Sequence, residues 1–305
     1  MLLNRLKSLV AEPPPAVAFE ISEAGIAAAR IGAGTPADFR PLKAGTLSVS
    51  PLKENVIDAD DFAAAVRALW ANYGSRNRRD VAVVLPDFST RMAVLDFDEF
   101  PSDAKEQLSL VRFRLKRSVP FDVEAAAVSY WAQHHPHKSS AVKSSANKRC
   151  DVLAVLTPLE IVARYEAPFR AAGMNPGLVT PSSVAALEMA PEAGLSVVAK
   201  ITGRALTVVV RENSAVKLVR CLEVSSQALE DLAAVLVPTF VYVEDNLGAR
   251  AESLFLCGFG TQFEAAARHF ERELGVRVES LRSRWGMPGE YNAGLLGYVQ
   301  SVSRN

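Results

Sequence analysis

The stretch over residues 196–226 constrains the fold of this chain more than any other part of the sequence. It holds three segments rich in β-branched residues, and the sequences Thr-Gly-Arg and Glu-Asn-Ser that separate them are typical of tight turns. Two such three-stranded meanders, about half a chain apart, predict an internal duplication and not a solenoid, whose repeats are much shorter. The earlier meander is expected to consist of strands over residues 16–21, 26–31 and 42–49, a turn over 22–25 and a longer loop over 32–41.

Length, composition and charge limit the class of protein. A chain of 305 residues has room for about two domains, and 49% apolar with 22% charged residues is ordinary for a soluble globular protein with a large core. The formal net charge is zero, so no overall field attracts nucleic acid, and we expect no nucleic-acid partner. Cys150, Cys221 and Cys257 are widely spaced and odd in number, which favours neither a disulfide framework nor a zinc site. With no long apolar run and no signal sequence, the expected location is the cytoplasm.

Helical and strand patterns alternate along the rest of the chain. Residues 58–73 form an amphipathic helical pattern in which Phe62, Val66 and Leu69 share one face. A helix ending near Gly173 is expected to begin with a capping box at Thr157. The other expected elements are strands over 81–85, 90–97, 126–133, 151–156, 178–180, 253–257 and 276–281, and helices over 101–118, 182–190, 227–247 (kinked at Pro238), 263–274 and 292–302.

Three stretches leave more than one interpretation open. Residues 1–10 place leucines at helical spacing, which is typical either of a membrane-surface or partner-docking helix or of a terminus packed on the core. The helix over 101–118 carries basic residues spread around its axis, which suits either an acidic or phosphate-bearing partner or a solvated surface. The polar stretch 134–148 holds three histidines, but without carboxylates or cysteines nearby we expect a loop and no metal site.

The expected elements follow the order meander, helix, strand and helix, and this order is repeated with an insertion in the first copy. Such a plan resembles the PilM family of type IV pilus assembly proteins and its type II secretion relatives, within the actin-like ATPase superfamily. The residues that carry the resemblance are 81–86 with 91–101, Arg117-Ser-Val-Pro-Phe121, 151–183 and 292–297. The resemblance implies an α/β, actin-like (duplicated RNase H-like) two-domain fold with a small α+β subdomain inserted in the first half. The implied first half is 1–193, with the insertion at about 87–149, and the second half is 194–305.

The resemblance also implies a nucleotide cleft, in which each meander turn carries Asp-x-Gly and a glycine-rich turn seats the adenosine. In this chain the first turn reads Glu20-Ile21-Ser22, and the second reads Lys200-Ile201-Thr202 followed by Gly203. Alternation along a strand then places Lys200 where the second carboxylate belongs. Only Gly258-Phe259-Gly260 keeps the pattern of the adenosine turn. The positions therefore describe a degenerate nucleotide cleft.

Three expectations follow for the cleft. We expect no metal and no bound ATP, because an ammonium group repels Mg²⁺. We expect an ion pair between Glu20 and Lys200, replacing the lost ligand bridge. Direct binding of phosphate by Lys200 and Arg204, without metal, is the alternative.

No other catalytic constellation competes with this interpretation, since His269 has no nucleophile at a recognisable spacing. We therefore expect no catalytic residues and no enzyme activity. The resemblance implies a cytoplasmic scaffold of a type IV pilus or type II secretion platform. It would be peripheral on the inner membrane through the cytoplasmic tail of a PilN-like membrane protein, and would contact other platform proteins. The alternative is a nucleotide-binding ATPase or small-molecule kinase of the same fold.

The partner's tail is expected to enter a groove in the insertion, where Pro120 ends a helix and leaves carbonyl groups without donors. The alternative is that the aromatic residues there close the core of the small subdomain. The predicted groove residues are Phe113, Pro120 and Phe121, with Arg112 or Arg117 at the rim.

Overall fold

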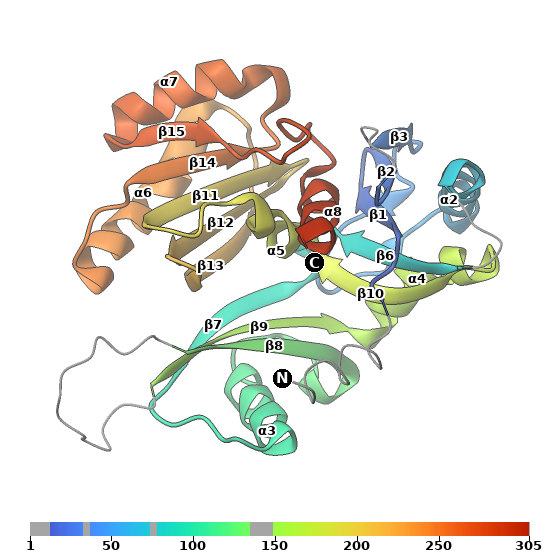
Figure 1. Cartoon of the computed structure of the whole chain (residues 1–305), viewed down its shortest axis with the longest axis horizontal. Helices are drawn as coiled ribbons and strands as arrows, with labels where there is room; N and C mark the ends of the chain where they lie inside the picture. Colours follow the sequence, from blue (N-terminus) through green and yellow to red (C-terminus); the bar gives the residue numbers. More distant parts are fainter. Residues whose placement is uncertain (1–12, 33–36, 74–77, 135–148, 305) are drawn as a thin grey trace.

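The computed structural model describes residues 13–32, 37–73, 78–134 and 149–304. The predictions for residues 1–10 and 135–148 lie outside these ranges. The described chain forms two sheet-based halves side by side, with a smaller subdomain against both (Figure 1). None of the helices in these ranges is both long and apolar enough to cross a membrane.

The first half is built on a five-stranded sheet in the order β10 (Asn175–Pro181), β6 (Asp80–Leu85), β1 (Val17–Ser22), β2 (Gly25–Arg30) and β3 (Asp38–Pro41). Strands β1, β2 and β3 form the antiparallel meander, whereas β6 runs parallel to both β1 and β10. Helices α2 (Ala59–Tyr73) and α4 (Leu159–Ala171) cover one face. There Phe62 from α2 and Phe169 from α4 pack with Phe19 from β1, all fully buried.

The second half repeats this plan. Its sheet has the order β13 (Ala215–Glu223), β12 (Ala205–Glu212), β11 (Leu195–Thr202), β14 (Ser253–Cys257) and β15 (Arg277–Ser280). The meander β11–β13 is antiparallel, and β14 and β15 add in parallel. Helices α6 (Leu229–Leu247) and α7 (Phe263–Leu274) pack beside each other on one face. The predicted duplication is confirmed, because the two sheets share strand order and direction.

Two helices fill the space between the sheets. Helix α5 (Ser182–Ala186) with the 3₁₀ turn η3 (Leu187–Met189) leaves the first half, and the last helix α8 (Ala293–Arg304) packs against it. Small side chains on the inner face of the first sheet, among them Ala18 and Ala82, let α8 approach closely. The end of the chain therefore returns from the second half to the first (Figure 1).

The insertion is a three-stranded antiparallel sheet in the order β7 (Arg91–Phe97), β9 (Cys150–Pro158) and β8 (Ala126–His134). Helix α3 (Ala104–Leu115) covers one face, and Val111 and Leu115 are its fully buried residues. A 3₁₀ turn, η2 (Val123–Ala125), leads into β8. The subdomain matches the predicted α+β insertion, although β9 extends it to Pro158.

Three element predictions are wrong in detail. The third strand of the first meander is β3, within the predicted loop, because the segment after it is held by Asp61, whose carboxylate accepts from Lys43 N and Thr46 Oγ1. Only short strands follow, β4 (Leu47–Ser48) and β5 (Asn55–Val56). Thr157 is a buried residue of β9, so α4 begins at Leu159 without a side-chain cap. Helix α3 ends at Leu115, so Pro120 does not terminate it. Helix α6 contains Pro238 within its length, as the prediction of one helix through this residue requires.

Candidate functional site

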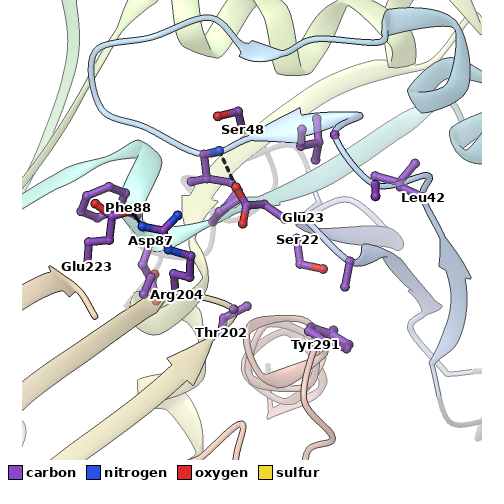
Figure 2. A pocket seen from close by; sticks show the side chains of 18 residues that line it. Ser22, Glu23, Leu42, Ser48, Asp87, Phe88, Thr202, Arg204, Glu223 and Tyr291 are labelled. Carbon is purple, nitrogen blue, oxygen red and sulfur yellow. Dashed lines mark hydrogen bonds and ion pairs between the residues drawn. The ribbon is translucent and has the colours of Figure 1, made fainter. Parts of the chain in front are cut away.

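The turns of the two meanders face each other across a cavity of about 520 Å³ between the halves. Glu23 of the β1–β2 turn lies on one side, and Arg204 of the β11–β12 turn lies on the other (Figure 2). Ala24 and Gly203 of the same turns also line the cavity. Gly203 has a φ of 55°, the left-handed conformation that glycine adopts at little cost. The duplicated sheets therefore leave a cavity between the two turns, lined by Ser22, Thr202 and Gly203 of the predicted cleft residues.

A buried ion pair borders this cleft through Asp87, which lines the cavity, whereas Lys200 is not among the lining residues. Lys200 Nζ lies 3.1 Å from Asp87 Oδ2, and the two side chains are only 3% and 2% exposed. Asp87 belongs to η1 (Asp87–Ser89), directly after β6, so the pair joins the two halves. Two further donors reach Asp87: Thr207 Oγ1 at 3.0 Å and Ser183 N at 2.7 Å. Lys200 also donates to Thr202 Oγ1 at 2.8 Å.

The charge on Lys200 is retained despite its burial. Burial lowers the pKa of Lys200, but the negative charges of Asp87 and Glu20 outweigh it, and the net pKa is raised. The same burial raises the pKa of the neighbouring Cys257 thiol to about 12, so this cysteine is protonated at neutral pH and inert as a nucleophile.

Glu20 is buried but does not form the predicted ion pair with Lys200. Its carboxylate accepts from Ser182 Oγ and, at 2.8 Å, from Leu295 N of α8. Burial raises its pKa, while the nearby charge of Lys200 lowers it. The prediction placed both residues on the correct faces of their strands, but the hydrogen bonds direct Glu20 to α5 and α8 and leave Asp87 as the partner of Lys200.

The other predicted cleft residues fix the backbone conformation of turns or allow close packing against them. Ser22 Oγ donates to Gly25 O at 2.9 Å and accepts from Gly25 N, which fixes the first turn. Gly258 has a φ of 84° and lies directly against the backbone of Ile201, where a Cβ would collide. Gly260, with a φ of 50°, lies against the side chain of Glu290. The glycine-rich turn thus packs beside the cleft and lines a small second cavity of about 110 Å³.

Sequence reasoning missed Asp87. The sequence feature that could have identified it is an aspartate directly after Pro86, at the carboxyl end of the buried strand β6. Ligands and functional side chains gather at this edge of a parallel sheet. Within the described ranges, no group of three or more His, Cys, Asp or Glu residues is placed to hold a metal ion.

A separate apolar groove of about 530 Å³ lies between the β4–β5 connection, α4 and the insertion. Leu52, Ile57, Phe121 and Ile161 contribute apolar walls, and Leu52 is 57% exposed. Sequence reasoning placed Phe121 in a groove but missed the other three. Their signal was a pair of apolar residues, Leu52 and Ile57, within a polar loop.

The other predicted groove residues lie elsewhere. Phe113 is 69% exposed on the outer face of α3, because the inner positions of that helix are taken by Val111 and Leu115. Arg112 is paired with Glu124 at 3.1 Å. Pro120 and Arg117 are exposed and do not line the groove.

The chain was compared with known proteins. No protein-family model and no curated protein matches it. The structure is similar to a chain of the "PilM-PilN type IV pilus biogenesis complex", with a TM-score of 0.72 and 17% identity over 95% of this chain and 99% of that one. It is also similar to a protein of unknown function with an actin-like ATPase fold from Bacteroides thetaiotaomicron, with a TM-score of 0.51 and 12% identity over 93% and 94% of the two chains. The cytoplasmic domain of EpsL, from the type II secretion system of Vibrio cholerae, matches with a TM-score of 0.47 and 16% identity over 79% and 80%.

Proposed function

Because the chain has the predicted actin-like fold, we propose that it is a non-catalytic scaffold of a type IV pilus or type II secretion assembly platform. In this proposal it binds the cytoplasmic tail of a PilN-like inner-membrane protein and is held at the membrane through that partner. Other proteins of the platform are its further contacts. The observation that carries the proposal is the buried Asp87–Lys200 pair beside the cleft.

The pair argues against nucleotide turnover for an electrostatic reason. Two unit charges near 4 Å interact by about 4 kcal/mol at an effective dielectric constant of 20, and a divalent cation doubles this repulsion from an ammonium group. Asp87 is the acidic residue best placed to offset this repulsion, but its carboxylate already accepts hydrogen bonds from Lys200, Thr207 and Ser183. A magnesium-bound phosphate would have to displace Lys200 from a contact that joins the two halves.

The groove beside the insertion supplies a site for a tail. An extended peptide binds where apolar pockets alternate with polar groups at the rim. Leu52, Ile57 and Phe121 supply such pockets, and Arg164 at the edge is held by Glu54 at 3.0 Å and Glu160 at 2.8 Å. A tail with apolar side chains in alternate positions suits these walls.

The test uses a peptide with the sequence of the cytoplasmic tail of a PilN-like inner-membrane protein. We expect Leu52→Asp and Phe121→Ala to weaken binding by at least about tenfold in fluorescence anisotropy, as truncation of buried anchors does. Leu52 is largely exposed, so Leu52→Asp should leave the melting temperature unchanged. Phe113→Ala is the matched control, because this aromatic residue lies outside the groove. Unchanged binding by both groove variants would refute the assignment.

The cavity between the halves supports the alternative, a nucleotide-binding ATPase or kinase. Its 520 Å³ lie beside the Thr202–Arg204 turn, although Arg204 is paired with Glu223 at 2.7 Å. Thermal-shift titration with Mg-ATP separates the two functions. A scaffold should show little stabilisation, whereas a rise in melting temperature that is lost in Arg204→Ala would favour the alternative.

A further inference from the structure

The outer face of α3 carries an aromatic residue among positive charges. Phe113 is exposed, and the exposed Lys116 and Arg117 follow in the turn just after α3 ends at Leu115. In the described part of the chain, neither of these two cations forms an ion pair, whereas Arg112 and Arg114 are paired with Glu124 and Asp96. This surface, the α3 face (Phe113, Lys116 and Arg117), therefore combines apolar area with net positive charge.

The outer face of α6 is apolar and has carboxylates at its two ends. Val237 and Val241 are 43% and 51% exposed, and with Ala234 and Pro238 they form a stripe on one side of the helix. No charged residue occurs from Ala233 to Val243. Proline has no N–H group, so the carbonyl of Ala234 lacks its helical donor and remains an acceptor on this surface. We call Ala234, Val237, Pro238 and Val241 the α6 face.

Carboxylates border the α6 face at both ends. Glu230 and Asp231 lie in the first turn of α6, and Asp245 lies in the last. All three are exposed, and none forms an ion pair with another described residue, whereas Glu244 is paired with Arg250 at 3.1 Å. The face is thus an apolar strip between negative ends.

We propose that the α3 face of one copy of this chain docks on the α6 face of a second copy. Two identical faces cannot pair. Two α6 faces would bring carboxylates against carboxylates, and two α3 faces would bring cations against cations. An anionic membrane would be repelled by the α6 face. The two faces lie on different parts of the molecule, the insertion and the second half (Figure 1).

This contact is head-to-tail, since each copy presents one α3 face and one α6 face. Head-to-tail contacts produce rings or open chains instead of closed two-fold dimers. Two crossed helices bury less area than a standard interface, so the contact is weak in solution and needs high protein concentration. Its ionic part makes it weaker in high salt.

Sedimentation velocity of the full chain over a wide concentration range tests the proposal. We expect the wild type to associate beyond a dimer, and Phe113→Asp or Val241→Asp to weaken association by at least about tenfold. An equimolar mixture of these two variants should form a dimer and nothing larger, because only one α3 face and one α6 face remain intact. Met287→Asp alters an exposed apolar residue outside both faces, so it is the matched control and should associate like the wild type.

Charge exchange provides a second readout. Lys116→Glu should weaken association, and mixing it with Asp231→Lys should restore part of it. The proposal is overturned if the wild type stays monomeric throughout, if both face variants associate like the wild type, or if the mixture of variants stays monomeric. Binding of the wild type to phosphatidylglycerol vesicles that Phe113→Asp abolishes, without self-association, would assign the α3 face to a membrane and also overturn it. None of these outcomes depends on the tail groove.

Discussion

At the scale of single residues, the burial of Lys200 as a charged group depends on Asp87. An ammonium group that is 3% exposed is costly to desolvate, and a direct carboxylate partner at 3.1 Å offsets that cost. Thr202 and Thr207 complete the hydrogen bonding of the pair. A buried pair of this kind fixes the relative position of the elements that carry it, here β11 and the turn after β6.

The first prediction concerns this pair. Lys200→Met should lower the unfolding free energy by about 3–5 kcal/mol, because it leaves Asp87 buried without a cation. Lys200→Met combined with Asp87→Asn should cost clearly less than the sum of the two single variants, since the pair is removed together. Urea denaturation of the four proteins gives the coupling. Additive effects would mean that the two side chains do not depend on each other.

The second prediction concerns Glu20 and pH. Burial raises the pKa of Glu20 above its ordinary value of 4.5. A carboxyl group with a raised pKa binds its proton more tightly in the folded state, so its contribution to stability is complete below the ordinary pKa and is lost as pH rises through the raised one. We expect the unfolding free energy to fall over that interval, and Glu20→Gln to flatten the fall. Parallel curves for the wild type and the variant would contradict the assignment.

The sequence places single residues on faces but does not choose their partners. The alternation of side chains along β1 and β11 correctly predicted that Glu20 and Lys200 face the interface between the halves. The partner of Lys200 lies 113 positions away in a turn. Its place there depends on how η1, which follows β6 of the first half, packs against β12 and β13 of the second. Likewise, helical spacing could not separate exposed Phe113 from groove-lining Phe121, because the two belong to different elements.

At the scale of elements, the contact between α5 and α8 joins the halves most closely. Gly297 of α8 lies against the backbone of α5, and an added Cβ would stand 2.6 Å from the carbonyl carbon of Ala185 and 2.8 Å from Ala186 Cα. Such close approach of two backbones requires a residue without a side chain.

Gly297→Ala should therefore destabilise the protein by about 1–3 kcal/mol, because overpacking between two backbones outweighs the better helix propensity of alanine. Gly289→Ala is the matched control, since its Cβ would meet Asn292 Oδ1 at an ordinary 3.7 Å. That control should change stability by less than about 0.5 kcal/mol. Thermal denaturation of both variants checks the difference, and an unchanged Gly297→Ala protein would show that the helices separate easily.

Strongly patterned elements could be predicted from sequence to within a few residues. The strands of the second meander, β14 and α7 follow directly from apolar periodicity and from glycine at the turns. The third strand of the first meander could not be predicted, because its position depends on the contact between Asp61 and Thr46. The start of α4 was missed for a similar reason, since pairing with β8 keeps Thr157 in a strand.

At the scale of the whole molecule, buried polar contacts join the insertion to the second half. The side-chain amide of Gln133 pairs with both backbone groups of Val216. Beside it, Lys217 lies 2.9 Å from Asp151. With the Asp87–Lys200 pair, these contacts connect all three parts of the molecule, which suits a scaffold that presents surfaces in a fixed arrangement.

The most direct test of the proposed scaffold function is steady-state phosphate release by the purified full chain with Mg-ATP. If Lys200 is a structural cation and not a ligand of nucleotide, the wild type and Lys200→Ala should both release phosphate at the background rate. Arg204→Ala serves as a control for the alternative phosphate-binding role. Sustained release by the wild type that disappears in Lys200→Ala, with the variant still folded, would contradict a non-catalytic scaffold.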